Sequence, residues 1–181
     1  MLLETPNLQI IPFETGDWEH IARWFYDPEY WGFFRHQPRA YKIHEFQTYP
    51  QIVKAEIFMV RLKATAEVIG MVQLMPDGKA NRGFHIGLIV DKKYQKQRFP
   101  LEIFLSVFDY CFNRMGYRKA MIEILESNEG LKRTLVESGF LFEGKFIGEC
   151  FMDGQWVNEL RYCMFDSFFN KKSKPTVDSW R

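Results

Sequence analysis

Long hydrophobic runs are absent from this chain of 181 residues. A helix that crosses a membrane needs about 20 consecutive apolar residues, and the sequence contains no stretch that approaches this length. We therefore expect no transmembrane span. Residues 1–6 also lack the basic start and the continuous apolar run of a signal peptide. These two absences favour a protein of the cytoplasm.

Cysteine is scarce. The chain has three cysteines, an odd number, and they form no C-x-x-C pair. That spacing is not typical of a disulfide framework or of a cysteine-based zinc site. Cys111, Cys150 and Cys163 lie inside apolar patterns, so we expect reduced cysteines in the core. The four histidines show no ligand spacing with cysteine or carboxylate, and we expect no metal site.

An excess of charge of either sign is also absent. The 24 Lys and Arg residues balance 23 Asp and Glu residues, which leaves a net charge of +1. A nearly neutral chain has no overall attraction to nucleic acid or to a membrane surface, so we expect neither as a partner. Any electrostatic function must come from a local patch of charge.

Aromatic residues, in contrast, are abundant. They make up 17% of the chain, and 18 of them are Phe. Rings of this kind usually fill the core of a globular domain. One aromatic-rich segment, residues 29–42, shows no regular pattern of helix or strand. Because a loop this apolar must pack against something, we expect it to form the wall of a pocket.

Alternating and helical patterns divide the chain into one domain, residues 1–169, and a flexible basic tail, residues 170–181. We expect strands at 8–13, 56–62, 67–75, 82–90, 119–125, 141–151 and 155–165, and helices at 18–26, 43–49, 100–115 and 128–137. Pro12 terminates the first strand and places it at a sheet edge, and Ser127 is expected to cap the last helix. The order of elements predicts an α+β domain. Its mixed, mostly antiparallel sheet has about seven strands, with helices on both faces.

The stretch from His85 to Gly116 is predicted as a buried strand, a basic turn and a helix. The turn, residues 91–98, carries four cations. Pro100 then opens a helix whose apolar residues recur every three or four positions, while Glu102 marks the polar face. A helix N-terminus offers unpaired N–H groups and the positive end of the macrodipole. This layout therefore favours an anionic ligand.

Six short motifs occur in a recognisable order. They are residues 8–13 with Asp17, Trp24 with 27–29, 86–90, 117–120 with Asn128, 137–140 with 143–144, and 153–156. Their order and spacing resemble the GNAT superfamily of N-acetyltransferases, and within it the group that acetylates the N-termini of ribosomal proteins. The likeness covers about residues 7–166.

The resemblance implies acetyl-CoA as co-substrate and direct transfer of its acetyl group to a primary amine. The cofactor would lie along the end of the central strand, the turn and the next helix, with two residues of a later helix. These positions are Leu88, Ile89, Val90, Gln95, Lys96, Gln97, Arg98, Phe99, Pro100, Leu101, Asn128 and Arg133. Backbone N–H groups near 88–90 would bind the carbonyl oxygen. Asn128 fits a turn before a helix equally well, and Arg133 fits exposed surface.

The turn departs from the family pattern, which has small residues where this chain has Lys96, Arg98 and Pro100. Small residues let backbone N–H groups approach the pyrophosphate closely. Lys and Arg tolerate positive φ poorly, and Pro100 has no N–H. Two interpretations stay open. Either charged side chains replace some amide donors and the turn still binds phosphate, or the site has decayed and the protein is a degenerate member with a binding or structural role.

A base should accept the proton of the attacking amine. His85 is our first candidate, because it lies on the central strand and imidazole titrates near neutrality. A hydrogen-bonded core histidine is the alternative interpretation. Glu123 is the next candidate, followed by Glu67. No tyrosine acid can be assigned, because Leu135 and Val136 occupy the expected neighbourhood.

The aromatic segment is expected to shape the acceptor pocket, with Trp31, Phe33, Phe34 and His36 against the substrate. The predicted function is acetyl transfer to a primary amine of a protein N-terminus, a lysine, an amino sugar or a polyamine. A homodimer is one assembly that we consider. Modification of a nucleic-acid base is a weaker alternative, for which the basic turn is the only indication.

Overall fold

The computed structural model describes residues 3–30, 55–78 and 82–172. Eight strands form one sheet in the order β1-β2-β3-β4-β5-β6-β8-β7. They are β1 Leu3–Glu4, β2 Leu8–Pro12, β3 Glu56–Leu62, β4 Val68–Pro76, β5 Gly83–Val90, β6 Lys119–Leu125, β7 Leu141–Met152 and β8 Gln155–Phe165. All neighbours run antiparallel except β5 and β6, which are parallel. The predicted α+β domain with a mixed, mostly antiparallel sheet is confirmed.

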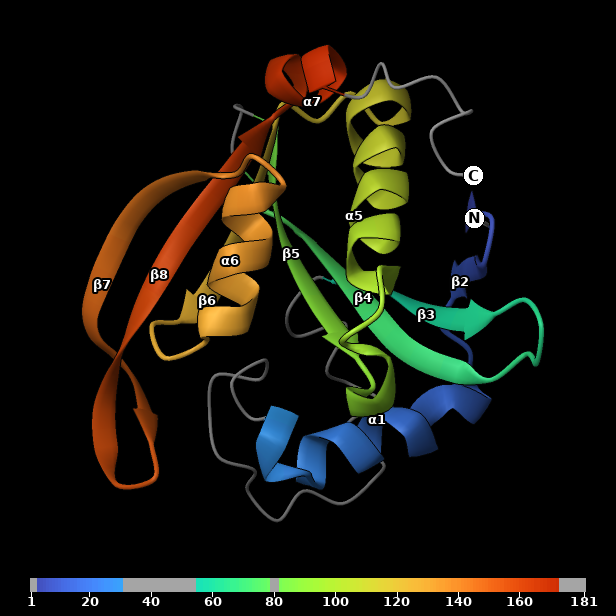
Figure 1. Ribbon diagram of the computed structural model, residues 1–181, viewed down its shortest axis with the longest axis horizontal. Helices are drawn as coiled ribbons and strands as arrows, with labels where there is room; N and C mark the ends of the chain where they lie inside the picture. The colour runs from blue at the N-terminus through green and yellow to red at the C-terminus, as the bar shows by residue number, and fades with distance from the viewer. Residues whose placement is uncertain (1–2, 31–54, 79–81, 173–181) are drawn as a thin grey trace.

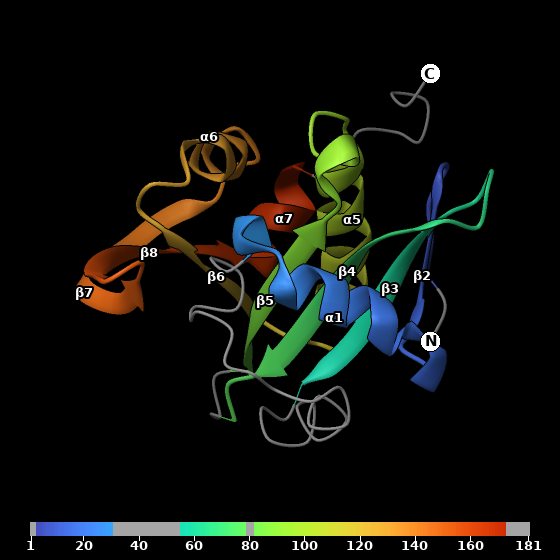
Figure 2. The same ribbon diagram turned by 90° about the horizontal axis from the view of Figure 1, so that it is seen from below.

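The helices are α1 Trp18–Tyr26, α5 Phe99–Asp109, α6 Glu129–Glu137 and α7 Asp166–Lys172, with short 3-10 turns at Thr15–Asp17, Pro28–Tyr30 and Lys92–Tyr94. Figure 1 shows α5 and α6 in front of the strands. Figure 2 shows β2 and β7 on opposite sides of the molecule. None of the helices in the described ranges is long and apolar enough to cross a bilayer.

Two buried clusters cover opposite faces of the sheet. In β3, Phe58 and Val60 belong to the larger cluster with α5 and α6, whereas Ile57 and Met59 belong to the smaller cluster with α1. Because successive side chains of a strand point to opposite faces, this division places helices on both faces, as predicted. The same parity applies to β5, where Phe84 joins the α5 side.

Three details of the elements differ from the prediction. The sheet has eight strands, because β1 pairs with β2 and takes the edge position that was predicted for residues 8–13. The helix after the basic turn ends as a π-helix over Tyr110–Arg114. Helix α7 continues to Lys172, past the predicted start of the tail at residue 170. The helix predicted at 43–49 lies outside the described residues.

Two side chains also behave differently from the prediction. Asn128, not Ser127, caps α6, because its side-chain oxygen accepts the Leu131 N–H at 3.0 Å. Glu102 was assigned to the polar face of its helix but is buried, and its carboxylate accepts hydrogen bonds from Thr5 and Asn7. The partners of Glu102 lie more than 90 positions away in the sequence, so helical periodicity does not report them.

Candidate functional site

The parallel strands β5 and β6 stay paired for only three residues. Gly83–His85 of β5 face Lys119–Met121 of β6, and no further pairs follow. Each strand keeps its other partner to its carboxyl end, since β4 pairs with β5 as far as Val90 and β8 pairs with β6 as far as Leu125. The two strands therefore diverge toward their carboxyl ends (Figure 1). This opening lies where the cofactor was predicted.

Both helices that follow these strands begin at the open end. Strand β5 leads through the basic turn to α5, and β6 leads through Ser127 and Asn128 to α6. Parallel strands send their connections out at the same edge, which brings the predicted positions 95–101 and those on α6 to one end of the sheet. Arg133 is exposed on α6. Asn128 is occupied as the N-cap, so its structural interpretation is supported.

Three ion pairs hold the basic turn to other elements, two through the carboxylates Glu29 and Glu67 and one through the turn's own Asp91. Arg23 lies 2.7 Å from Asp91, Lys92 pairs with Glu29, and Lys93 pairs with Glu67. Tyr94 also donates to Glu67 at 2.6 Å. The hydrogen bond from Lys93, and to a smaller extent the one from Tyr94, lowers the pKa of the Glu67 carboxyl. Glu67 thus fixes the turn instead of facing an acceptor amine.

Two cations of the turn, Lys96 and Arg98, make no ion pair within the part of the chain that the structure describes. Both are exposed at the start of α5. The side chain of Gln95 is occupied differently, because its amide donates to the Val90 carbonyl at 2.9 Å. An anion at this helix start would therefore meet two positive charges that no described residue neutralises.

Backbone torsion angles do not require glycine at the substituted positions. Among the described residues, none between Asp91 and Leu101 has positive φ. The objection that Lys96 and Arg98 would be strained does not hold for this backbone. Pro100 occupies the second position of α5, directly after Phe99, where its missing N–H costs little because the first turn has no internal acceptors.

At the start of the opening, His85 contacts Glu123, which in turn contacts Arg161. The Nδ1 of His85 lies 2.9 and 3.0 Å from the two carboxylate oxygens of Glu123, and Arg161 of β8 donates through Nε to Glu123 at 2.7 Å. His85 and Glu123 both face the α1 side, because Phe84 and Ile122 belong to the α5 cluster. The structure therefore joins two predicted catalytic candidates.

Arg161 is the functional candidate that sequence reasoning missed. Its position is set by the pairing of β8 with β6, in which Arg161 lies opposite Glu123. The sequence indicated the hairpin around Asp153 and Gly154, but not that its second strand inserts next to β6. The only local signal is the alternation of the charged residues Glu159 and Arg161 with apolar residues in this strand.

The remaining predicted positions lie at the opening, in the core or outside the described residues. Leu88, Ile89 and Val90 line the open part of β5, with Ile89 and Val90 buried. Leu135 is fully buried in the core, which agrees with the absence of a tyrosine acid there. The predicted substrate residues, Trp31, Phe33, Phe34 and His36, lie outside the described residues. No group of three potential metal ligands occurs in the ranges that the structure describes.

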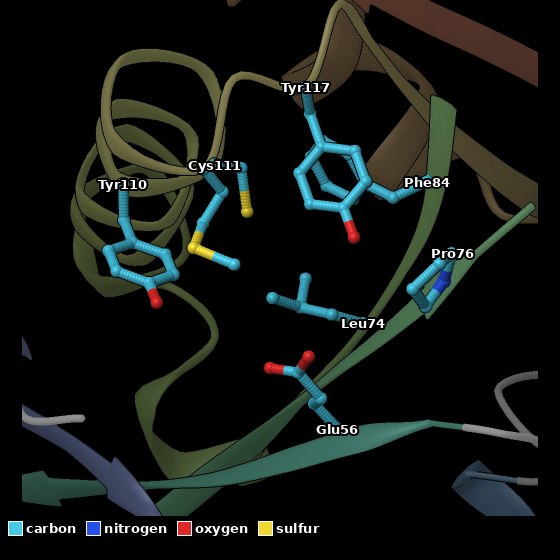
Figure 3. Close-up of a pocket in the computed structure, with 8 residues that line it drawn as sticks. Glu56, Leu74, Pro76, Phe84, Tyr110, Cys111 and Tyr117 are labelled. Carbon is cyan, nitrogen blue, oxygen red and sulfur yellow. The ribbon is translucent and has the colours of Figure 1, made fainter. Parts of the chain in front are cut away.

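A small pocket lies away from this opening (Figure 3). It has a volume of about 10 Å³, which is roughly the space of one water molecule. Its lining includes Glu56, Tyr110 and Tyr117, and it lies at the end where Phe84 of β5 is still paired with β6. Neither acetyl-CoA nor an amine substrate fits this volume.

Known proteins with related sequences are acetyltransferases of small amines. Spermidine N(1)-acetyltransferase of Escherichia coli K12 is 25% identical over 104 residues, which is 58% of this chain and 56% of that protein. The chain thus spans a little over half of that relative. The enzyme of the same name from Vibrio cholerae is 22% identical over 172 residues, or 95% of both chains. The relatives found are spermidine acetyltransferases, not the predicted ribosomal-protein group.

Solved structures show the same fold. Spermidine N-acetyltransferase from Vibrio cholerae, in complex with CoA and spermine, superposes with a TM-score of 0.83 at 19% identity, covering 92% of this chain and 99% of that one. A GNAT-family acetyltransferase from Bacillus anthracis gives a TM-score of 0.76 at 19% identity, covering 92% and 99%. The family model described as an acetyltransferase (GNAT) domain matches residues 7–141. The chain therefore belongs to the GNAT family of acetyltransferases.

Proposed function

We propose that this chain transfers the acetyl group of acetyl-CoA to a primary amine of a polyamine such as spermidine. The observation that carries the proposal is the opening between β5 and β6, with His85 on one face and, at one end, two cations that pair with no described residue. Family membership supports the acetyl donor. The spermidine acetyltransferases that match this chain support the acceptor class.

The pantetheine arm of acetyl-CoA carries amide groups. Beyond their three paired residues, β5 and β6 offer main-chain groups that they do not use for pairing with each other. Lys96 and Arg98, with Arg133, supply positive charge for the phosphates. Acetyl-CoA supplies an activated acyl group as a thioester. The torsion angles of the turn do not require glycine, which removes one of the two objections to phosphate binding at this turn.

A second acceptor class is favoured by one feature of the sequence. Residues 29–42, the segment predicted to form the acceptor wall, contain Arg35, Arg39 and Lys42 but a single carboxylate, Glu29. Positive charge disfavours a polycation by simple repulsion. A neutral or acidic molecule with one primary amine, such as a peptide N-terminus, is therefore the second candidate.

Modification of a nucleic-acid base is not supported further. Lys92 and Lys93, half of the cations of the basic turn, are paired with Glu29 and Glu67, which leaves only a small positive patch.

An acetylation assay with a panel of amines tests these proposals. Purified protein is incubated with acetyl-CoA and, separately, spermidine, spermine, a neutral N-terminal peptide, a lysine peptide and an amino sugar. We expect the highest kcat/KM for spermidine or spermine. A preference for the peptide N-terminus would favour the second class instead. No detectable binding of CoA in isothermal titration at millimolar ligand would overturn the enzymatic proposal altogether.

A further inference from the structure

Three polar side chains form a continuous chain across three strands beside the opening. His85 comes from β5, Glu123 from β6 and Arg161 from β8. All three lie on the α1 side of the sheet, because their neighbours in each strand belong to the cluster on the α5 side. The chain begins at the last residue of β5 that is paired with β6, directly where the strands diverge.

The contact with Glu123 fixes the chemistry of the two imidazole nitrogens. An ionised carboxylate only accepts hydrogen bonds, so the His85 Nδ1 at 2.9 Å must carry a hydrogen. A neutral imidazole then has its free electron pair on Nε2. This nitrogen has no hydrogen-bond partner among the residues that the structure describes, and the side chain is 26% exposed.

Arg161 keeps this arrangement in place. The Glu123 side chain is only 4% exposed, and a buried carboxylate stays ionised only with a compensating partner. A guanidinium is always charged, and its Nε lies 2.7 Å from Glu123. Arg161 is itself held against the ring of Phe146, 4.6 Å from the ring centre. The position of Glu123 is therefore defined from two sides.

We propose that Nε2 of His85 is the base of the acetyl transfer, and that Glu123 and Arg161 are positioning residues that hold His85 in the required tautomer. The inference deepens the proposed function and rests on it. It assigns a role to Arg161 that family resemblance did not indicate, and it gives Glu123 a role other than that of the base.

The proton and electron balance of the step is simple. The electron pair of the neutral acceptor amine forms the new C–N bond at the thioester carbonyl carbon. His85 Nε2 takes the proton that this nitrogen must lose. The C–S bond breaks, and its electron pair leaves with sulfur. The imidazolium returns its proton to the thiolate directly or through water, so that the products are the N-acetyl amine and CoA thiol.

Other charged groups face the same side and belong to the electrostatics of His85. They are Lys119 of β6, which pairs with Glu143 of β7, and the buried Glu159 of β8. On β4 the register partner of His85 is Met75, which carries no charge. Glu123 is the only carboxylate within hydrogen-bond distance of the imidazole in the described ranges.

The first test removes the base. In His85→Gln we expect kcat for the best amine to fall by about 10²–10⁴-fold with little change in KM. The acidic limb of the kcat/KM profile, where the base takes a proton, should disappear. Glu149→Gln, a substitution of an exposed residue on β7, is the matched control. An unaltered kcat and pH profile in His85→Gln would overturn the assignment, provided that the wild type is active.

The second test separates positioning from stability. Glu123→Gln presents an amide N–H to Nδ1 and favours the wrong tautomer, so kcat should fall about 10²-fold or more. In a His85→Gln background the same change should alter kcat by less than about threefold, because the residues act as a unit. Additive losses in the double variant would indicate a structural ion pair only.

The third test observes the tautomer directly. Nitrogen-15 spectra of the His85 ring should show a bare Nε2 and a protonated Nδ1 in the wild type. The bare nitrogen should move to Nδ1 in Glu123→Gln, and Arg161→Met should produce a mixture that Arg161→Lys largely avoids. A wild-type ring with the opposite tautomer would overturn the proposal even if the protein acetylates amines. A correct tautomer in a protein without acetyl transfer would instead overturn the proposed function.

Discussion

Glu102 is the residue that ties the N-terminal strands to α5. It is 5% exposed and accepts hydrogen bonds from the Thr5 hydroxyl and from the backbone and side-chain nitrogens of Asn7, each of the latter at 3.0 Å. All three partners donate. Only a carboxylate, which has no hydrogen on either oxygen, accepts from all of them.

We therefore expect Glu102→Gln to lower the free energy of unfolding by about 1–3 kcal/mol, because its amide hydrogens oppose a donor. Urea denaturation followed by circular dichroism measures the change. Glu137→Gln, at an exposed position of α6, serves as control and should lie within about 0.5 kcal/mol of wild type. Equal stability of both variants would contradict the assigned role.

The thiols of two buried cysteines have perturbed pKa values. Burial raises the pKa of the Cys111 thiol to about 12, and the Glu56 carboxylate acts in the same direction. Burial also raises the pKa of Cys163. A thiol whose folded pKa exceeds its unfolded value stays protonated in the native state, so the associated stability is complete below pH 9 and is lost as the pH rises toward 12.

We predict that native protein at pH 8–9 shows no rapid reaction with a thiol reagent, since only thiolates react and all three cysteines are buried. In strong denaturant all three should react. Absorbance of the released chromophore gives the count. One fast thiol in the native protein would show that a cysteine is exposed.

At the scale of elements, the basic turn contains two kinds of cation, which differ in whether a described carboxylate pairs with them. Lys92 has Glu29 as partner, whereas Lys96 and Arg98 lack one among the described residues. A bound phosphate gains most from charges that are not already neutralised. Substitutions at the two kinds of cation can therefore be compared within one turn.

Changing Lys96 and Arg98 together to Ala should raise the Kd of CoA about tenfold or more, which corresponds to about 1.4 kcal/mol, and should reduce its dependence on salt. Lys92→Ala should change the Kd much less. Isothermal titration at two salt concentrations measures both. A change in binding free energy half as large for Lys92→Ala, which removes one charge instead of two, would mean that only the total charge of the turn matters.

At Gly70 of β4 the neighbouring main chain of β5 leaves no room for a side chain. A Cβ added there would overlap the Ile89 carbonyl oxygen, so the main chain at the open part of β5 depends on this glycine. Gly130 of α6 differs, because the nearest atom to an added Cβ is the Asn128 side-chain oxygen at 3.9 Å.

Gly70→Ala should destabilise the protein by about 1–3 kcal/mol through overpacking. Gly130→Ala should have the opposite sign and stabilise it by up to about 1 kcal/mol, because alanine favours the helix. Urea denaturation of both variants provides the comparison. A Gly70→Ala protein as stable as the wild type would show that β5 shifts without cost.

At the scale of the whole molecule, the sheet consists of two groups of strands that are joined by three residue pairs. Strands β1 to β5 form one group, and β6, β8 and β7 form the other. A ligand in the opening would contact both. Ligand at a concentration of 100 times Kd should add about 2.7 kcal/mol to the free energy of unfolding.

Amide hydrogen exchange locates that effect. With CoA bound, we expect slower exchange at residues 86–90 and 122–125, which line the opening, and little change in β2 or β3. Mass spectrometry of peptides from exchanged protein resolves these regions. Protection confined to other strands would place the ligand elsewhere.

Local patterns predicted most of the elements, because hydrophobic alternation and helical spacing are properties of neighbouring residues. The bounds predicted for β6, 119–125, agree with the structure. What the sequence did not reveal depends on distant partners. The insertion of β8 between β6 and β7, and hence the position of Arg161, is set by long-range pairing.

The candidate site was predictable to a similar degree. The turn and the central strand were identified from motifs, and His85 and Glu123 were named separately. Their direct contact follows from the parallel register of β5 and β6, which alternation alone does not determine. The predicted homodimer stays a prediction.

The short joint between β5 and β6 also has a consequence for hydration. Beyond His85 and Met121, main-chain groups of the two strands have lost their mutual partners, and buried polar groups of this kind require water when no ligand is present. Binding would then exchange ordered water for the amides of the ligand. The heat-capacity change of binding should therefore contain a contribution from released water as well as one from buried apolar surface.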